Sequence, residues 1–183
     1  MKKGKFIVIS GPSGVGKGTI CKKIISDLKL EYSVSMTTRQ KRDGEIDGIN
    51  YYFTTKEDFE KRIKNDEFIE YAIYNDNYYG TLKKEVIDKI NMGKNIICEI
   101  EVQGAKQIKK LFPEALLIFI MPPSIEELRN RLINRHTNDL EDVERRIKIA
   151  KEENKYKDIY DYIVINDDLE KATNKVKEII ANK

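Results

Sequence analysis

The chain has 183 residues, a length that fits one compact domain with small inserted modules better than two independent enzymatic domains. Its 40% hydrophobic residues allow a sizeable core, and its 34 basic and 31 acidic residues exclude a disordered tail or a polybasic arm. The net charge of +3 is too small to predict a nucleic-acid partner, because such proteins usually carry a strongly basic stripe.

The first predicted unit is a strand, a glycine-rich turn and a helix. Lys5 to Ser10 is a β-branched apolar run, and Thr19 to Leu30 has apolar residues at helical spacing. Between them, Gly11 to Lys17 matches the phosphate-loop pattern G-x-x-x-x-G-K. In this pattern backbone N–H groups wrap a polyphosphate and the lysine reaches its β and γ phosphates. An ordinary glycine-rich turn is the alternative, and the flanking strand and helix disfavour it.

Gly18 follows the lysine, where the pattern usually has the hydroxyl residue that binds Mg²⁺. That hydroxyl must then come from Thr19 or be replaced by water. The lysine-glycine-threonine ending resembles the loops of small-nucleotide kinases more than those of GTPases. The sequence therefore predicts binding of a nucleoside triphosphate.

Residues 37 to 90 break the rhythm of buried strands and helices. They hold polar turns, most of the tyrosines and short alternating segments at 51–53 and 68–74. We interpret them as an inserted substrate module. Two arginines and a tyrosine hydroxyl near its start are donors suited to an isolated phosphate, so the module is expected to contain a monophosphate pocket.

The rest of the chain alternates buried strands with helices. Apolar runs without alternation suit parallel strands buried on both faces, and they lie at 95–100, 115–120 and 162–165. Helical patterns cover 103–111, 124–134, 140–155 and 169–181. This order predicts an α/β doubly wound fold with a parallel sheet.

Arginine is concentrated in places, whereas lysine carries most of the surface charge. Five of the eight arginines lie between positions 129 and 146. Arg131 and Arg135 are one helical turn apart, and the polar stretch 135–142 is a candidate flap over a phosphate site. Guanidinium groups brought onto one polyphosphate would lower the barrier to phosphoryl transfer. For any single arginine the alternative is a solvated pair, for instance Arg131 with Glu127.

The remaining features concern location. The longest apolar run, 115–121, is far too short to cross a bilayer, so no membrane partner is expected. The N-terminal apolar run is too short for a targeting segment. Cys21 and Cys98 lie within apolar patterns, which favours buried free thiols in a reducing compartment. The chain is therefore expected to be cytoplasmic, and the sequence is also compatible with a homo-oligomer.

Further motifs follow one another along the chain: NDEFIEY (65–71), NYYGT (77–81), CEIEVQG (98–104), PPS (122–124) and INDDL (165–169). With the phosphate loop, they make the chain closely resemble the guanylate kinase family almost end to end. The resemblance implies a three-layer P-loop kinase fold and Mg²⁺-dependent transfer of the γ-phosphoryl group of ATP to GMP, a step of purine nucleotide metabolism. It divides the chain into a core (1–36, 91–127 and 147–183), a GMP-binding module (37–90) and a lid (128–146).

The resemblance also implies the acceptor site. The GMP phosphate would be held by Arg39, Arg42, Tyr51 and Tyr79, the O6 and N7 side of guanine by Ser35 and Thr81, and its N1–H and amino group by Glu70 and Glu101. Adenine lacks the N1 proton and the 2-amino group, so AMP would leave the buried carboxylates unpaired. Taken alone, Glu70 could be merely exposed, and Tyr79 could simply pack the module with Tyr78.

On the donor side, the resemblance assigns the ATP phosphates to Gly11, Pro12, Ser13, Gly14, Val15, Gly16, Lys17, Gly18 and Thr19. It assigns the transferring phosphoryl group to Lys17 with Arg131, Arg135 and Arg146, adenine to Asn166, and Mg²⁺ to Thr19 and Glu99, partly through water. Three residues depart from the family pattern: Glu101 stands where some members have Asp, and His136 and Asn138 stand where Gly and an acidic residue are commoner.

Two other functions remain open at this stage. Another nucleoside-monophosphate kinase would have a similar ATP half and a different acceptor pocket. A guanylate-kinase-like module can also serve as a noncatalytic protein-binding scaffold. The scaffold alternative expects a degraded phosphate loop, and the loop of this chain is intact.

Overall fold

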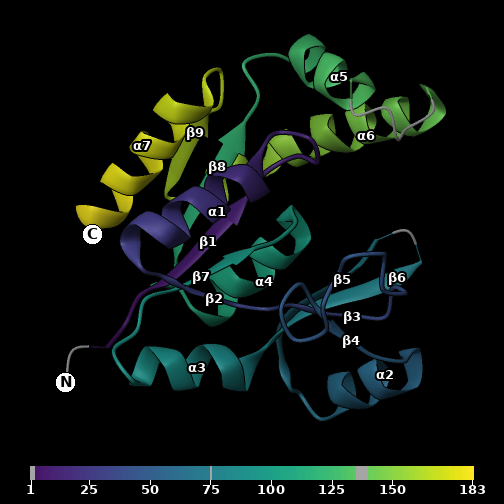
Figure 1. The fold of residues 1–183 in the computed structure, drawn as a ribbon, viewed down its shortest axis with the longest axis vertical. Helices are drawn as coiled ribbons and strands as arrows, with labels where there is room; N and C mark the ends of the chain where they lie inside the picture. The colour runs from purple at the N-terminus through teal and green to yellow at the C-terminus, as the bar shows by residue number, and fades with distance from the viewer. Residues whose placement is uncertain (1–2, 75, 135–139) are drawn as a thin grey trace.

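The core is a parallel sheet covered by helices on both faces (Figure 1), in a computed structural model that describes residues 3–74, 76–134 and 140–183. Its five strands lie in the order β2-β7-β1-β8-β9, and every pair is parallel. They are β1 (Phe6–Ser10), β2 (Glu31–Tyr32), β7 (Ile96–Glu99), β8 (Leu116–Met121) and β9 (Tyr162–Ile165). The predicted α/β fold with a parallel sheet is confirmed.

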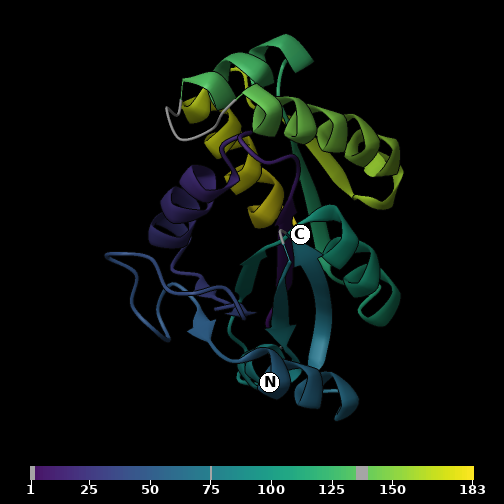
Figure 2. The same ribbon diagram turned by 90° about the vertical axis from the view of Figure 1, so that its right-hand side faces the viewer.

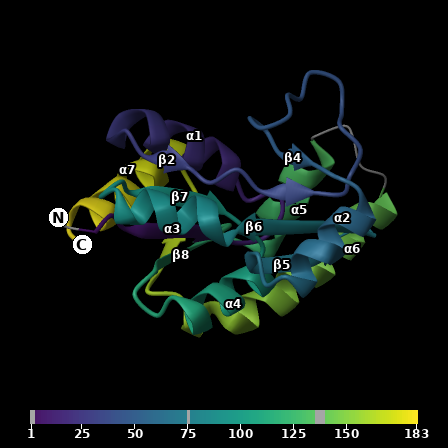
Figure 3. The same cartoon turned by 90° about the horizontal axis from the view of Figure 1, so that it is seen from below.

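The central strand shows why these segments are continuous apolar runs. Along β1, Ile7 and Ile9 pack into one core cluster, whereas Phe6 and Val8 pack into another on the opposite face. The first cluster lies under α1 (Lys17–Leu28) and α7 (Leu169–Ala181), and the second under α4 (Val102–Leu111). Figure 3 shows α1 and α7 on one side of the sheet and α4 on the other. Because both faces of the strand are covered, the run is apolar from Phe6 to Ile9, and the buried Ser10 at its end pairs with the Tyr160 hydroxyl.

A second sheet lies beside the core in the order β4-β3-β6-β5. Its strands are β3 (Met36–Thr37), β4 (Tyr52–Phe53), β5 (Phe68–Tyr74) and β6 (Asn77–Leu82), with α2 (Lys56–Lys64) packed against them. The small core is aromatic: the ring of Phe59 stacks on Phe68 at 4.3 Å and on Tyr78 at 5.1 Å between centroids. Tyr78 thus packs the module, as one alternative expected.

Helix α3 (Lys83–Asn91) connects this sheet to the core. All but its last residue lies within the range 37–90 predicted for the module, yet its Val86 is buried in the core cluster beside β7. The division of the chain at residues 37, 90, 128 and 146 stays a prediction.

The helices α5 (Ile125–Ile133) and α6 (Leu140–Glu153) form a pair with its own apolar seam, followed by the 3₁₀ helix η1 (Asn154–Ile159). Figures 1 and 2 place this pair at the opposite end of the molecule from the second sheet. Within the described ranges, no helix combines the length and the apolar character that crossing a membrane requires.

Candidate active site

The phosphate loop leaves the carboxyl end of β1 and enters α1. Gly16 has φ 98° and ψ 12°, a left-handed conformation that glycine adopts at little cost, and α1 begins at the next residue. A cavity of about 320 Å³ opens over this helix end, and it is lined by Pro12, Ser13, Gly14, Gly16, Lys17, Gly18, Thr19, Lys22, Glu99 and Glu101. Gly11 and Val15 are buried beneath it. Unpaired N–H groups at a helix N-terminus make such a cavity suited to an anion.

Lys17 is drawn back onto its own loop. Its side chain is only 6% exposed, and Nζ donates hydrogen bonds to the carbonyl oxygens of Gly11 and Pro12, the second at 3.1 Å. The carboxylate oxygen Glu101 Oε1 lies 3.9 Å from the ammonium nitrogen. The ammonium group is therefore held at the cavity by weak neutral acceptors, which a phosphate oxygen can replace.

Of the three arginines predicted for phosphoryl transfer, Arg146 reaches the loop. Its Nη1 donates to Ser13 Oγ at 2.9 Å, and its Nε donates to Asp142 Oδ2 at 2.7 Å. Arg131 instead donates from Nε to Glu127 Oε1 at 2.8 Å, the local pair expected as its alternative. Arg135 lies outside the described residues, together with His136 and Asn138.

Asn166 lies behind the loop. It is buried, and its Nδ2 donates a hydrogen bond of 2.7 Å to the carbonyl oxygen of Val15. The observed contact holds the loop from the side of β9, whereas its contact with adenine stays a prediction. Thr19 is exposed in the first turn of α1. Glu99 is the last residue of β7. Its Oε2 lies beside the loop, because a Cβ atom added at Gly18 would lie 3.3 Å from this oxygen.

A second cavity, of about 240 Å³, lies between the two sheets. It is lined by Tyr32, Ser35, Tyr51, Glu70, Ala72, Tyr74, Tyr79, Glu99, Ile100 and Glu101. Five of the eight residues predicted for GMP therefore meet here: Ser35, Tyr51, Glu70, Tyr79 and Glu101. Tyr32 and Tyr74, which also line the cavity, were not predicted from the sequence. The high tyrosine content of residues 37–90 was a signal for Tyr74 but not for Tyr32, which lies outside that range.

Glu70 is the buried carboxyl group of this cavity. It is 4% exposed on β5, which excludes the alternative of a merely exposed strand end, and its Oε1 accepts a hydrogen bond from Thr81 Oγ1 at 2.6 Å. Thr81 thus acts on Glu70 from the neighbouring strand β6. Burial raises the pKa of Glu70 to about 7, against the lowering effect of the Thr81 hydrogen bonds. Such a group gains from a ligand that donates hydrogen bonds to it.

Gly104 makes room for that carboxyl group. A Cβ added there would lie 2.3 Å from Glu70 Oε2, closer than any real contact. We expect Gly104→Ala to push Glu70 out of position and to weaken GMP binding by roughly tenfold, the loss of about one charge-assisted hydrogen bond. Equilibrium titration with GMP measures this. The helix position itself favours alanine over glycine, so an unchanged GMP affinity would show that Glu70 does not depend on this space.

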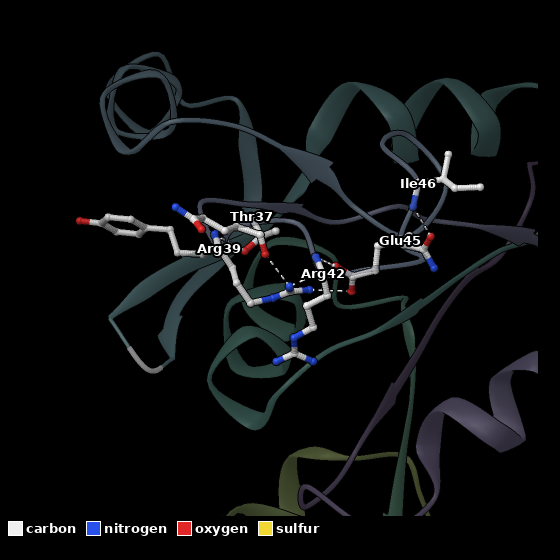
Figure 4. A network of polar contacts seen from close by, with 8 residues as sticks. Thr37, Arg39, Arg42, Glu45 and Ile46 are labelled. Atoms are coloured by element: carbon white, nitrogen blue, oxygen red, sulfur yellow. Dashed lines mark hydrogen bonds and ion pairs between the residues drawn. The ribbon is translucent and has the colours of Figure 1, made fainter. Parts of the chain in front are cut away.

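Arg39 does not line the same cavity, but it lies against two tyrosines that do. Its guanidinium carbon is 5.4 Å from the centroid of the Tyr51 ring, and Tyr51 in turn packs edge-on against Tyr79 at 5.9 Å. The guanidinium forms a two-pronged ion pair with Glu45 (Figure 4). Arg42 is exposed, and its guanidinium points away from Glu45 in the same view. The structure thus brings Arg39 to the tyrosines and leaves Arg42 outside.

Glu101 lines both cavities, and a carboxyl group that the sequence did not indicate lies next to it. Glu153 ends α6, its Oε2 is buried, and burial followed by the charge of Glu101 raises its pKa above the usual range. No local pattern distinguishes this residue from the other charged positions of α6. Only the three-dimensional fold brings it to Lys17 and Glu101.

Comparisons with known proteins agree with this geometry. A family model described as guanylate kinase matches residues 3–183. The crystal structure of guanylate kinase from Anaplasma phagocytophilum is 34% identical, with a TM-score of 0.82 over 99% of this chain and 86% of that one. An uncharacterized protein from Eubacterium ventriosum (16% identity, TM-score 0.57, 99% and 100% covered) and shikimate kinase from Bacteroides thetaiotaomicron (11%, 0.53, 97% and 98%) share the fold.

Proposed function

Because this chain belongs to the guanylate kinase family and phosphorylates GMP with ATP, we propose that its two cavities are the two substrate sites. ATP binds at the phosphate loop and GMP binds over Glu70. One observation carries this assignment: Glu99 and Glu101 line both cavities, so ligands in the two would meet above the end of β7. Ligands of open α/β sheets bind at the carboxyl ends of the strands, which is where these two cavities lie.

On the donor side, the loop amides and the start of α1 bind the ATP phosphates. Lys17 turns from the carbonyls of Gly11 and Pro12 to the β and γ phosphates. Arg146, already bonded to Ser13 of the loop, places a planar donor at the transferred group. Arg131 and Arg135 would join it when the lid closes, and Asn166 would contact adenine.

On the acceptor side, charge and hydrogen bonding select GMP. Glu70, held by Thr81, accepts from the N1–H and the amino group of guanine, and Glu101 takes part from the opposite wall. Ser35 faces the other edge of the base. The phosphate binds Arg39, Tyr51 and Tyr79, with Arg42 moving in from the exposed loop.

The reaction needs little proton transfer. A GMP phosphate oxygen attacks the γ phosphorus, the bond to the β-phosphate oxygen breaks, and ADP and GDP leave. The acceptor phosphate is largely dianionic at pH 7, so no base is required. Lys17 and Arg146 stabilise the charge spread over the transferred group, and closure over both sites keeps water away from it.

The residues beside the loop fit Mg²⁺. The Glu99 carboxylate and the Thr19 hydroxyl are oxygen donors, which Mg²⁺ prefers. In the ranges that the structure describes, no three His, Cys, Asp or Glu side chains form a metal-binding group. The donor set therefore suits an ion that arrives with ATP and keeps several waters. When bound, Mg²⁺ neutralises charge on the β and γ phosphates.

A panel of acceptors tests the function. We expect the release of ADP from ATP to require an acceptor and to be fast only when that acceptor is GMP. With AMP, UMP or CMP it should be slower by roughly 10⁴-fold, as for sites that bind a substrate through buried polar groups. A coupled assay of ADP measures it. Comparable rates with AMP would contradict the assignment of Glu70, and no stimulation by any of the four would remove the acceptor site.

We further propose a cytoplasmic enzyme of purine nucleotide metabolism that recycles GMP. The buried free thiols of Cys21 and Cys98 support a reducing compartment, and burial raises the pKa of both above the usual range. Assembly into a homo-oligomer stays a prediction.

A further inference from the structure

The carboxylate of Glu45 accepts hydrogen bonds from two residues of one turn in the module, Arg39 and Arg42. Its Oε1 accepts from Arg39 Nη2 at 2.7 Å, and its Oε2 accepts from Arg39 Nη1 at 3.1 Å. The same Oε2 accepts from the backbone N–H of Arg42 at 2.8 Å. Figure 4 shows the carboxylate between the guanidinium and that N–H. One side chain thus fixes the Arg39 fork and closes residues 39–45 into a turn.

The guanidinium is also held on its other sides. Nη1 donates to the carbonyl oxygen of Gln40 at 2.7 Å, and the rings of Tyr51 and Phe53 lie 5.4 Å and 5.8 Å from its central carbon. The hydrogen bonds with Glu45 hold the pKa of Arg39 above its usual range, and Tyr79 contributes to that shift. Planar guanidinium groups lose less freedom per hydrogen bond when they are already oriented.

Two roles are conceivable for Glu45: to mask Arg39 by competing with the GMP phosphate, or to hold Arg39 in place for that phosphate. Neither Glu45 nor Arg39 lines the acceptor cavity, whereas Tyr51 and Tyr79, which both act on Arg39, do line it. Glu45 also accepts a hydrogen bond from the backbone N–H of Arg42, a contact that shapes the turn and that masking alone would not need. These contacts favour the positioning role.

We propose that Glu45 is a positioning residue for the acceptor phosphate, which orients Arg39 toward Tyr51 and Tyr79 and ties it to the turn that carries Arg42. This inference rests on the proposed function, since it names what prepares the phosphate half of the GMP site. Glu45 touches neither substrate and acts through Arg39. Its replacement is expected to change GMP capture and to leave the ATP site alone.

The test is calorimetric titration of the whole chain with GMP in the absence of ATP. Glu45→Gln keeps the size of the side chain and removes its charge, and we expect it to weaken GMP binding by about tenfold, as for loss of one charge-assisted contact. The KM for ATP should stay unchanged. Glu67→Gln is the matched control, because it removes a carboxylate from another ion pair of the module, with Arg62 Nη1 at 2.9 Å.

A double-mutant cycle tests whether Glu45 acts on GMP binding through Arg39. In an Arg39→Ala background, Glu45→Gln should cost nothing further, since the group that it orients is gone. Equal loss in both backgrounds, unchanged affinity or tighter binding in Glu45→Gln would each overturn the proposal, the last by favouring a masking role. Thermal unfolding of each variant separates misfolding from misplacement. If the unaltered chain failed to bind GMP, the proposed function itself would fall.

Discussion

Replacing Lys17 with alanine should lower kcat by about 10²- to 10³-fold, the usual cost of removing one donor that acts on charge developing in the transition state. The ammonium group is buried at the cavity, and its hydrogen bonds go to loop carbonyls, which a phosphate can replace. In the proposed arrangement, GMP binds elsewhere, over Glu70. We therefore expect the GMP dissociation constant, measured without ATP, to stay unchanged, while steady-state kinetics record the loss in kcat.

Lys23 provides the control for this experiment. It lies on the same helix, 43% exposed, with its ammonium 3.9 Å from Glu170. Lys23→Ala makes the same change of charge on α1 and should leave kcat unaltered. A Lys17→Ala enzyme with normal kcat, or one in which GMP affinity fell as much as turnover, would contradict the placement of the donor phosphates at the loop.

The sequence was most informative where an apolar run is continuous or an apolar pattern has a clear helical period. The apolar run at Tyr162–Ile165 and the helical pattern at Leu169–Ala181 agree with β9 and α7 to the residue. The expected burial of β9 on both faces is wrong, because β9 is an edge strand of the sheet and only its Val164 is buried. Seven other predicted elements, from β1 to α6, differ from the structure by only one or two residues at one or both ends, because helix and strand ends depend on local capping.

Elements of the module were harder to predict. Strand β3, like β2 of the core sheet, has only two residues, too few for any period to show. In α2, Phe59 is the single buried residue, so its charged sequence has little apolar pattern. β6, with the sequence NYYGTL, contains asparagine and glycine, which are typical of turns, and it is a strand because β3 and β5 pair with it on both sides.

The residues of the candidate site also differ in how far a local sequence pattern predicts them. The phosphate loop is a local motif, so its lysine and glycines could be predicted without a fold. Asn166 reaches Val15 across 151 positions of the chain, and Glu153 reaches Glu101 from the end of another helix. Such contacts exist only after β9 and α6 pack against the core. Sequence patterns report local periodicity and therefore carry no signal for them.

Three of the four arginines that we propose to bind substrates in the described part of the chain share one arrangement. Arg39, Arg131 and Arg146 each donate to a carboxylate, from Glu45, Glu127 and Asp142 respectively. The partners of Arg131 and Arg146 lie four positions away on the same helix. Glu45 lies six positions from Arg39 in the same turn. For these three arginines the carboxylate partner is therefore supplied by a nearby part of the chain.

Glu70→Gln should lower kcat/KM for GMP by roughly 10²-fold, because a buried carboxylate that accepts two hydrogen bonds becomes an amide with one acceptor and one misplaced donor. The amide N–H can donate to N1 of adenine, so the preference for GMP over AMP should fall by at least the same factor. Initial rates of ADP release with each acceptor measure both changes. Glu60→Gln is the control, since this carboxylate contacts Tyr78 outside the acceptor cavity, at 3.3 Å.

The pH dependence of GMP binding gives the same assignment a second test. Burial raises the pKa of Glu70 to about 7 in the free enzyme, and guanine donates only to its ionised form. GMP affinity should therefore be greatest above pH 7 and fall as the carboxyl group is protonated below it, by up to about tenfold per pH unit. The GMP phosphate also titrates, near pH 6. The Glu70→Gln variant should retain only the phosphate transition near pH 6. Loss of the transition near pH 7 in this variant would assign that transition to Glu70. Identical pH profiles of the two enzymes would show instead that ionisation of Glu70 does not control GMP binding.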